Sequence, residues 1–83
     1  MKQPRDLSGQ ELAWLLGRLG YVKTRQKGSH MRLTCLATST KPEHHVAIPD
    51  HHVLKIGTLA DILDDVATAQ GLTRDELIAR LFD

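Results

Sequence analysis

Apolar residues recur at helical spacing near the start of the chain and predict an amphipathic helix over residues 9–19. The apolar stripe consists of Leu12, Leu15, Leu16 and Leu19. Ser8 and Glu11 have the spacing of a capping box, in which the two side chains satisfy exposed backbone N–H groups at a helix start. Gly20 favours a helix end at this point, because glycine adopts the left-handed conformation without strain.

The period of the apolar pattern then changes to two, which predicts three antiparallel strands. These strands cover residues 21–26, 30–37 and 44–48, and Pro49 ends the last one. The alternation also assigns the two faces of the sheet. The residues expected to face the helices are Met31, Leu33, Cys35, Val46 and Ile48. Those expected to face solvent are His30, Arg32, Thr34, His45 and Ala47.

Helical spacing returns after Gly57-Thr58, with an apolar stripe of Leu59, Ile62, Leu63 and Val66 that ends near Gly71. A second capping box, Thr73 with Glu76, begins a short third helix. The predicted fold class is α+β, a three-stranded antiparallel sheet packed against two helices in the order α-β-β-β-α, with an extra C-terminal helix. We expect residues 1–83 to form a single domain, because the length of the chain leaves room for only one.

Charge is distributed unevenly, although the net charge is only +1. Residues 1–57 hold nine Lys or Arg and four acids, whereas residues 58–83 hold two Lys or Arg and six acids. A basic first part is compatible with a nucleic-acid surface, but small domains also have lopsided solvated faces. The lone Cys35 and the lack of an apolar run of membrane-spanning length lead us to expect a cytoplasmic protein with no membrane association.

A histidine among cations is the candidate chemistry. His30 follows the predicted tight turn Lys27-Gly28-Ser29, and Arg25 and Arg32 lie close in sequence. Histidine exchanges protons near neutral pH, and neighbouring cations hold a phosphate and stabilise the charge that develops on it. These groups are the minimum set for RNA cleavage without a metal, and a second proton-transfer group or water has to complete it. The same spacing is also typical of an ordinary basic surface.

The other histidines do not predict a metal site. His44 and His45 are adjacent on a strand and point to opposite faces, so they cannot chelate one ion together. The sequence contains no HExxH spacing and no cysteine pair. We therefore expect no metal and no cofactor. The helix start at Gly57-Thr58 could accept a phosphate at its free N–H groups, or could simply begin a helix.

Several motifs together resemble the HicA toxin family, small ribonucleases of bacterial and archaeal toxin–antitoxin modules. They are RQKGSH at 25–30, VAIPDH at 46–51 and LKIGTLADIL at 54–63. The resemblance covers residues 7–72, and residues 73–83 form an additional helix. It implies a fold like that of a double-stranded-RNA-binding domain. Two departures are Met31-Arg32, where many relatives have a second histidine or an aromatic residue, and the acidic pair Asp64-Asp65 in the second helix.

The resemblance implies that His30 is the catalytic histidine of an mRNA-cleaving enzyme, acting as general acid or base. We expect His51 to share the proton transfer. The residues expected to bind RNA phosphate are Arg25, Lys27, Gly28, Ser29, Arg32 and Lys55. The implied partner is a HicB-like antitoxin that covers the site, and we expect oligomers only through that complex. Two alternatives stay open: an RNA-binding module of the same fold that cleaves nothing, and an interaction domain whose acidic tail helix docks a partner.

Overall fold

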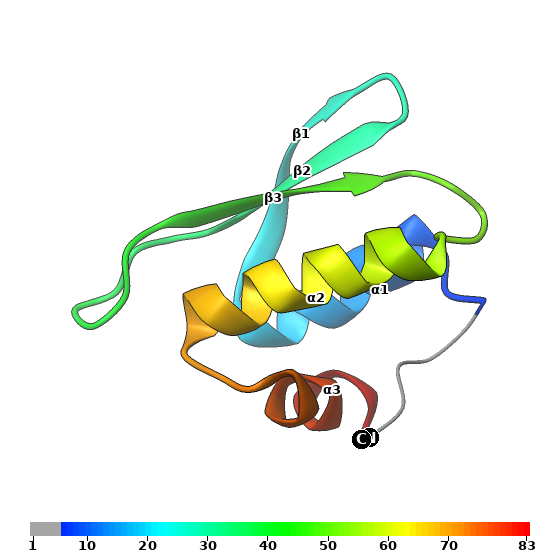
Figure 1. The fold of residues 1–83 in the computed structure, drawn as a ribbon. Helices are drawn as coiled ribbons and strands as arrows, with labels where there is room; N and C mark the ends of the chain where they lie inside the picture. The colour runs from blue at the N-terminus through cyan, green and yellow to red at the C-terminus, as the bar shows by residue number, and fades with distance from the viewer. Residues whose placement is uncertain (1–5) are drawn as a thin grey trace.

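The computed structural model describes residues 6–83, and these confirm the predicted α+β fold (Figure 1). Its elements are α1 (Gly9–Leu16), the 3-10 helix η1 (Gly17–Leu19), β1 (Tyr21–Lys27), β2 (His30–Cys35), β3 (His44–Pro49), α2 (Ile56–Gln70) and α3 (Arg74–Phe82). The predicted first helix thus ends in a 3-10 turn, and β2 stops two residues earlier than predicted. Lys2 and Arg5, two cations of the basic first part, lie outside the described residues.

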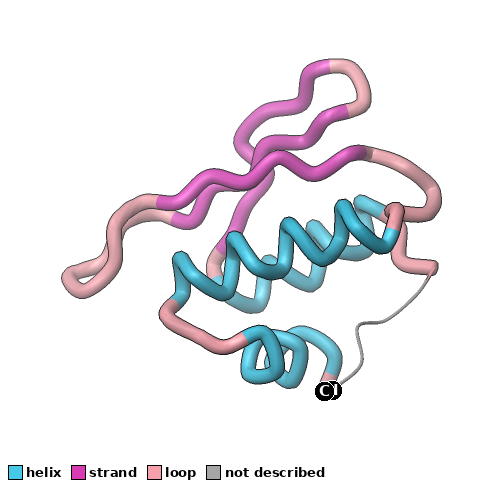
Figure 2. The backbone as a smooth tube through the Cα atoms, in the orientation of Figure 1, coloured by secondary structure: helices cyan, strands magenta, loops and turns pink. Residues whose placement is uncertain are grey.

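The strands form one antiparallel sheet in the order β1-β2-β3, so β2 is central and β1 and β3 are its edges (Figure 2). Two residues connect β1 to β2, and Lys27 lies opposite His30. The register shifts between Lys23 and Arg25, which leaves Thr24 in a bulge. Sequence alternation does not predict this bulge, because the bulge depends on how β1 pairs with β2 and not on the pattern within β1.

The helices form two layers beneath the same face of the sheet (Figure 1). Helix α1 contacts β1 and β3, and α2 contacts β3. Helix α3 contacts α1 and α2 on the side away from the sheet. The opposite, outer face of the sheet has no helix over it within the described residues. A basic side chain on that face therefore stays accessible.

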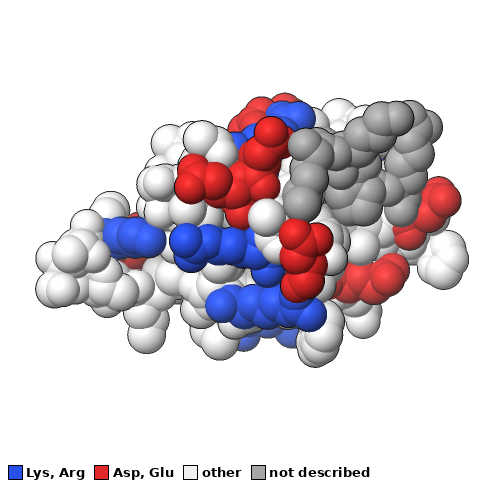
Figure 3. Space-filling model, turned by 90° about the horizontal axis from the view of Figure 1, so that it is seen from below, with Lys and Arg blue, Asp and Glu red and all other residues white. Residues whose placement is uncertain are grey.

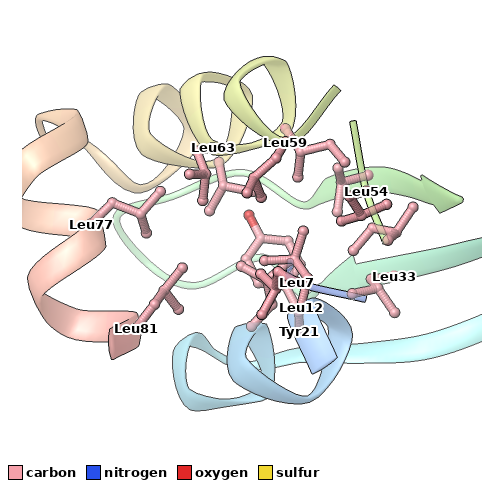
Figure 4. Packing of buried hydrophobic residues seen from close by; sticks show 14 of the residues in the cluster. Leu7, Leu12, Tyr21, Leu33, Leu54, Leu59, Leu63, Leu77 and Leu81 are labelled. Atoms are coloured by element: carbon pink, nitrogen blue, oxygen red, sulfur yellow. The ribbon is translucent and has the colours of Figure 1, made fainter. Parts of the chain in front are cut away.

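The predicted apolar stripes meet between these layers (Figure 4). The largest fully buried side chains include Leu12, Leu16, Leu33, Ile48, Leu59, Leu63, Val66, Leu77, Ile78 and Leu81. Three of these belong to α3, so the extra helix contributes to the same core as the sheet and the first two helices. Burying such side chains stabilises the fold by about 1.5–3 kcal/mol each.

Both predicted capping boxes are present. The Ser8 hydroxyl accepts from the Glu11 N–H at 3.0 Å, and the Glu11 carboxylate accepts from the Ser8 N–H at 3.1 Å. Thr73 and Glu76 make the equivalent pair at the start of α3. The backbone hydrogen bonds lower the pKa of both glutamates below the usual 4.5. Gly20 ends the first helical segment with φ 93°.

Thr34 lies on the predicted outer face, but the expectation that it faces solvent is wrong, because it is only 4 % exposed. Its side chain lies on the outer face, but two neighbouring side chains cover it. The Thr34 hydroxyl lies 2.9 Å from the Thr24 hydroxyl and 2.8 Å from Nδ1 of His45. Cys35, expected to be buried, is half-buried. Both differences arise because a period-two pattern gives the direction of a side chain and not what lies above it.

Polar contacts also attach α3 to the layer above it. The Arg74 guanidinium donates to the Asp64 carboxylate at 2.8 and 2.6 Å, and Arg18 donates to the carbonyl of Leu81 at 3.0 Å. The same Arg18 guanidinium lies 5.5 Å from the ring centre of Trp14, which is 71 % exposed. Acidic and basic side chains are mixed on this underside of the molecule (Figure 3). The underside therefore differs from a uniformly basic surface.

Replacing Leu81 by Ala should lower the free energy of unfolding by about 2–5 kcal/mol, because it leaves a cavity between α3 and the other helices. Chemical denaturation measures the change. The matched control is Arg80→Ala, an exposed change on the same helix, for which we expect a change within about 0.5 kcal/mol. Equal stability of the Leu81 variant and wild type would show that α3 does not belong to the cooperative core.

Candidate functional site

Three cross-strand rows of side chains line the outer face of the sheet, since directly opposed residues of antiparallel strands share a face. The histidine row is Lys27, His30 and Pro49; the arginine row is Arg25, Arg32 and Ala47; the threonine row is Val22, Thr34 and His45. Successive rows are two residues apart along β2, a separation of roughly 7 Å. The register thus places three cations and two histidines on one face.

The turn that precedes His30 has the backbone geometry of a tight hairpin. Gly28 has φ 58°, in the region that favours glycine, whereas the φ of Ser29 is not positive. A positive φ at only the first central residue is typical of a type II′ turn, which matches the twist of the flanking strands. This turn sets Lys27 and His30 opposite each other at the end of the hairpin.

Asp50 holds this hairpin against the rest of the domain. Its backbone N–H donates to the carbonyl of Ser29 at 2.6 Å. Its carboxylate accepts from the side-chain amides of Gln26 in β1 and Gln10 in α1, each at 3.2 Å. Three segments far apart in sequence therefore meet at one carboxylate. The sequence analysis does not single out Asp50, although the VAIPDH motif at 46–51 contains it.

The first turn of α1 lies against the same segment. A Cβ atom added at Gly9 would overlap the carbonyl oxygen of Pro49. The N–H of Gly9 donates to the carbonyl of His51 at 3.0 Å, and the N–H of Leu54 donates to the carbonyl of Leu7 at 2.8 Å. Backbone contacts thus fix the start of the connection between β3 and α2.

His30 lies at the edge of an open hollow of about 450 Å³. The described residues that line it are Arg25, Lys27, His30, Met31, Arg32, His45, Val46 and Ala47. These include three cations and no acid. The His30 ring makes no hydrogen bond to another described residue, and the same holds for the side chains of Arg25 and Arg32. An imidazole and cations that have no partner among the described residues are groups suited to transferring a proton and holding a phosphate.

His45 also lines this hollow, although the sequence analysis does not select it as a site residue. Its Nδ1 lies 2.8 Å from the Thr34 hydroxyl, and its Nε2 lies 2.8 Å from the Glu43 carboxylate. Both ring nitrogens are therefore engaged within the protein. One signal could have identified His45. Alternation predicts that its side chain points to the outer face, as that of His30 does, and the two residues lie on neighbouring strands.

The other predicted residues lie outside the hollow. His51 is exposed and lines a separate hollow with Ser8, Gln10, Asp50 and His52. Lys55 is exposed at the N-cap of α2, and it does not line the hollow of His30. The structure thus brings together Arg25, Lys27, His30 and Arg32, with Gly28 and Ser29 in the adjoining turn. A pairing of His30 with His51 stays a prediction.

A second histidine network lies at the opposite end of the sheet. His44 Nδ1 is 2.6 Å from the hydroxyl of Tyr21, and its Nε2 is 3.1 Å from the carboxylate of Asp65. Gln70 donates to the same hydroxyl at 3.3 Å. Tyr21 is 2 % exposed, and burial raises the pKa of its hydroxyl. We interpret this network as a connection between β1, β3 and α2.

Two further observations limit the chemistry of the described residues. Within residues 6–83, no group of three or more His, Cys, Asp or Glu side chains is arranged to hold a metal ion. None of the helices in the same part of the chain combines the length and apolar character needed to cross a bilayer. Within the described part of the chain, the hollow beside His30 brings an imidazole and three cations together.

Comparison with known proteins adds a family match. A family model described as HicA toxin of bacterial toxin–antitoxin matches residues 9–67. The matched segment begins with α1, contains all three strands and the hairpin turn, and ends within α2. Helix α3 lies beyond it. No curated protein and no solved structure matched the chain.

Replacing Asp50 by Ala should loosen the hairpin, because the Gln10 and Gln26 amides lose their shared acceptor. Amide hydrogen exchange in residues 26–31 should become about tenfold faster, a loss of about 1.4 kcal/mol of local stability. Asp61→Ala, a change at an exposed acid in α2, is the matched control and should leave these amides unchanged. Unchanged exchange in the Asp50 variant would contradict the role of this carboxylate.

Proposed function

The chain belongs to the HicA toxin family of bacterial toxin–antitoxin systems, and from this premise we propose that it is a metal-independent endoribonuclease that cleaves mRNA in the cytoplasm. The observation that supports the proposal best is the hollow on the outer face, where His30, which has no partner among the described residues, lies among Arg25, Lys27 and Arg32. We also propose a HicB-like antitoxin as the partner that neutralises it in a type II module.

The proposed reaction needs a base and an acid; His30 supplies one of them, and His51 is the candidate for the other, with water as the alternative. A base removes the proton of a ribose 2′-hydroxyl, and the oxygen attacks the adjacent phosphorus. The bond from phosphorus to the 5′-oxygen breaks, and an acid protonates that oxygen as it leaves. The products are a 2′,3′-cyclic phosphate and a 5′-hydroxyl. His30 acts as the base or the acid, and the three cations bind the phosphate and stabilise its developing charge.

The surroundings of His30 support a surface for single-stranded or distorted RNA. The hollow is open and the sheet is uncovered on this side, so a strand can lie across β2. Gly28 and Ser29 would bring the turn backbone close to a phosphate. Lys55, at the start of α2, would bind a more distant phosphate. The acids Asp64 and Asp65 lie on α2, beneath the opposite face of the sheet, so they do not line the proposed RNA surface.

An antitoxin that covers this face would have to match its charge. A partner with acidic side chains over the arginine row would exclude RNA and pair with cations that have no partner among the described residues. We propose that the protein forms oligomers only through this complex. The alternative function is a module that binds RNA without cleaving it. Such a module would use the same cations but would not need His30.

His30→Ala should abolish growth arrest and mRNA loss in cells that express the protein without its antitoxin, because it removes the proposed proton-transfer group. The purified variant should cleave a short RNA at least about 100-fold more slowly, the range of general acid–base catalysis. Circular dichroism checks that the variant is folded, and His52→Ala, which lies outside the His30 hollow, is the matched control. Retained toxicity in the His30 variant would contradict the catalytic role.

Cleavage of the short RNA should continue in EDTA, because the proposed mechanism uses no metal ion. Loss of cleavage in EDTA that a divalent ion restores would contradict this mechanism.

The share of His51 in proton transfer is tested by the pH dependence of cleavage between about pH 5 and 9. If His30 and His51 act as a pair of base and acid, wild type should give a bell-shaped profile, and His51→Ala should lose one limb. Arg25→Ala should weaken binding in a salt-dependent manner and leave both limbs in place. Two intact limbs in the His51 variant would assign the second proton transfer to water or to another group.

A further inference from the structure

The hydrogen bonding of the His45 ring differs from that of the His30 ring, and the difference indicates that the two residues have different roles. Both residues line the same hollow, but the His30 ring has no hydrogen-bond partner among residues 6–83, whereas His45 has both nitrogens engaged. The Glu43 carboxylate can only accept, so Nε2 of His45 carries a hydrogen, and in the neutral ring Nδ1 accepts from the Thr34 hydroxyl. A ring held in this way has no nitrogen left for proton transfer.

The ring is nevertheless accessible. The side chain of His45 is 39 % exposed, although it covers Thr34. Thr24, in the bulge of β1, supports the Thr34 hydroxyl from the other side at 2.9 Å. Hydrogen bonds at both edges and a buried threonine beneath it give the imidazole a fixed orientation. An aromatic ring with a fixed orientation on an open β-sheet is a typical platform for an unstacked base.

The space beside this ring comes from Ala47. It lies between Pro49 and His45 on the outer face of β3, and it is the smallest residue of the arginine row. Its methyl group leaves the floor of the hollow open next to the imidazole, with Arg32 directly opposite on β2. A base on the His45 ring would thus have its phosphate within the region of the arginine pair.

We propose that His45 is a base-stacking subsite for a nucleotide about two positions from the bond that His30 cleaves. The histidine and threonine rows are four residues apart along β2, or roughly 13 Å. An extended RNA strand would cover this separation in about two nucleotides, with the arginine row at the phosphate between them. This inference rests on the proposed function. Because stacking tolerates every base, the subsite would contribute affinity and add little sequence preference.

The test combines protein variants with abasic RNAs. The probe is a short single-stranded RNA with a 2′-deoxy substitution at the cleaved nucleotide, so that binding is measured without cleavage. An abasic nucleotide is then placed at each position in turn. For wild type, one position about two nucleotides from the cut should show about tenfold weaker binding when its base is absent, within the range for base–aromatic stacking.

His45→Ala should bind the intact RNA about tenfold more weakly and should lose the sensitivity to the abasic nucleotide at that position only. His45→Phe keeps a ring but removes both hydrogen bonds, and it should retain most of the affinity and the sensitivity. His52→Ala is the matched control and should behave as wild type. Equal sensitivity in wild type and His45→Ala would overturn the subsite. Equal losses in the Phe and Ala variants would also overturn it, because they would show that the nitrogens matter and not the ring.

The same assay separates failure of the subsite from failure of the proposed function. If wild type binds and cleaves RNA while the His45 variants match it at every abasic position, only the subsite is wrong. If wild type neither binds nor cleaves the unmodified RNA, both the proposed function and the subsite are wrong.

Discussion

The candidate site depends on a contact between two backbones that is possible only because residue 9 is glycine. The first turn of α1 lies against the carbonyl of Pro49, where a Cβ atom would overlap it. This contact fixes the chain at Asp50, and Asp50 in turn holds Ser29 and Gln26 of the hairpin. The position of His30 is therefore set by a helix that lies on the other face of the sheet. A larger residue at position 9 would alter the site without touching any residue in it.

Much of the fold could be predicted from the sequence because each element carries a local signal. Both capping boxes, the glycines at the helix ends and the apolar stripes act within a few residues, and the structure has all of them. Prediction was less successful where the determining contact is distant in sequence. The bulge at Thr24 and the burial of Thr34 depend on how neighbouring strands lie over each other, which alternation alone does not encode.

The candidate site was predictable to a similar extent and for the same reason. Arg25, Lys27, His30 and Arg32 lie within eight residues, and a two-residue turn necessarily brings them to one face. His51 and Lys55 belong to a connection without a regular period, so spacing could not place them relative to His30. His45 lines the hollow because β3 pairs with β2, a contact between residues distant in sequence. Its neighbour Ala47 shows that a small residue can define a site by what it leaves open.

The position of β1 at the edge of the sheet has a consequence for solubility at high concentration. An edge strand exposes unpaired backbone groups that can add a strand from another copy and start aggregation. Lys23, Arg25 and Lys27 give this edge three like charges, and the bulge at Thr24 bends it away from ideal pairing. Two copies approaching edge to edge would thus repel each other. The cations proposed to hold RNA would also protect the strand that carries them from self-association.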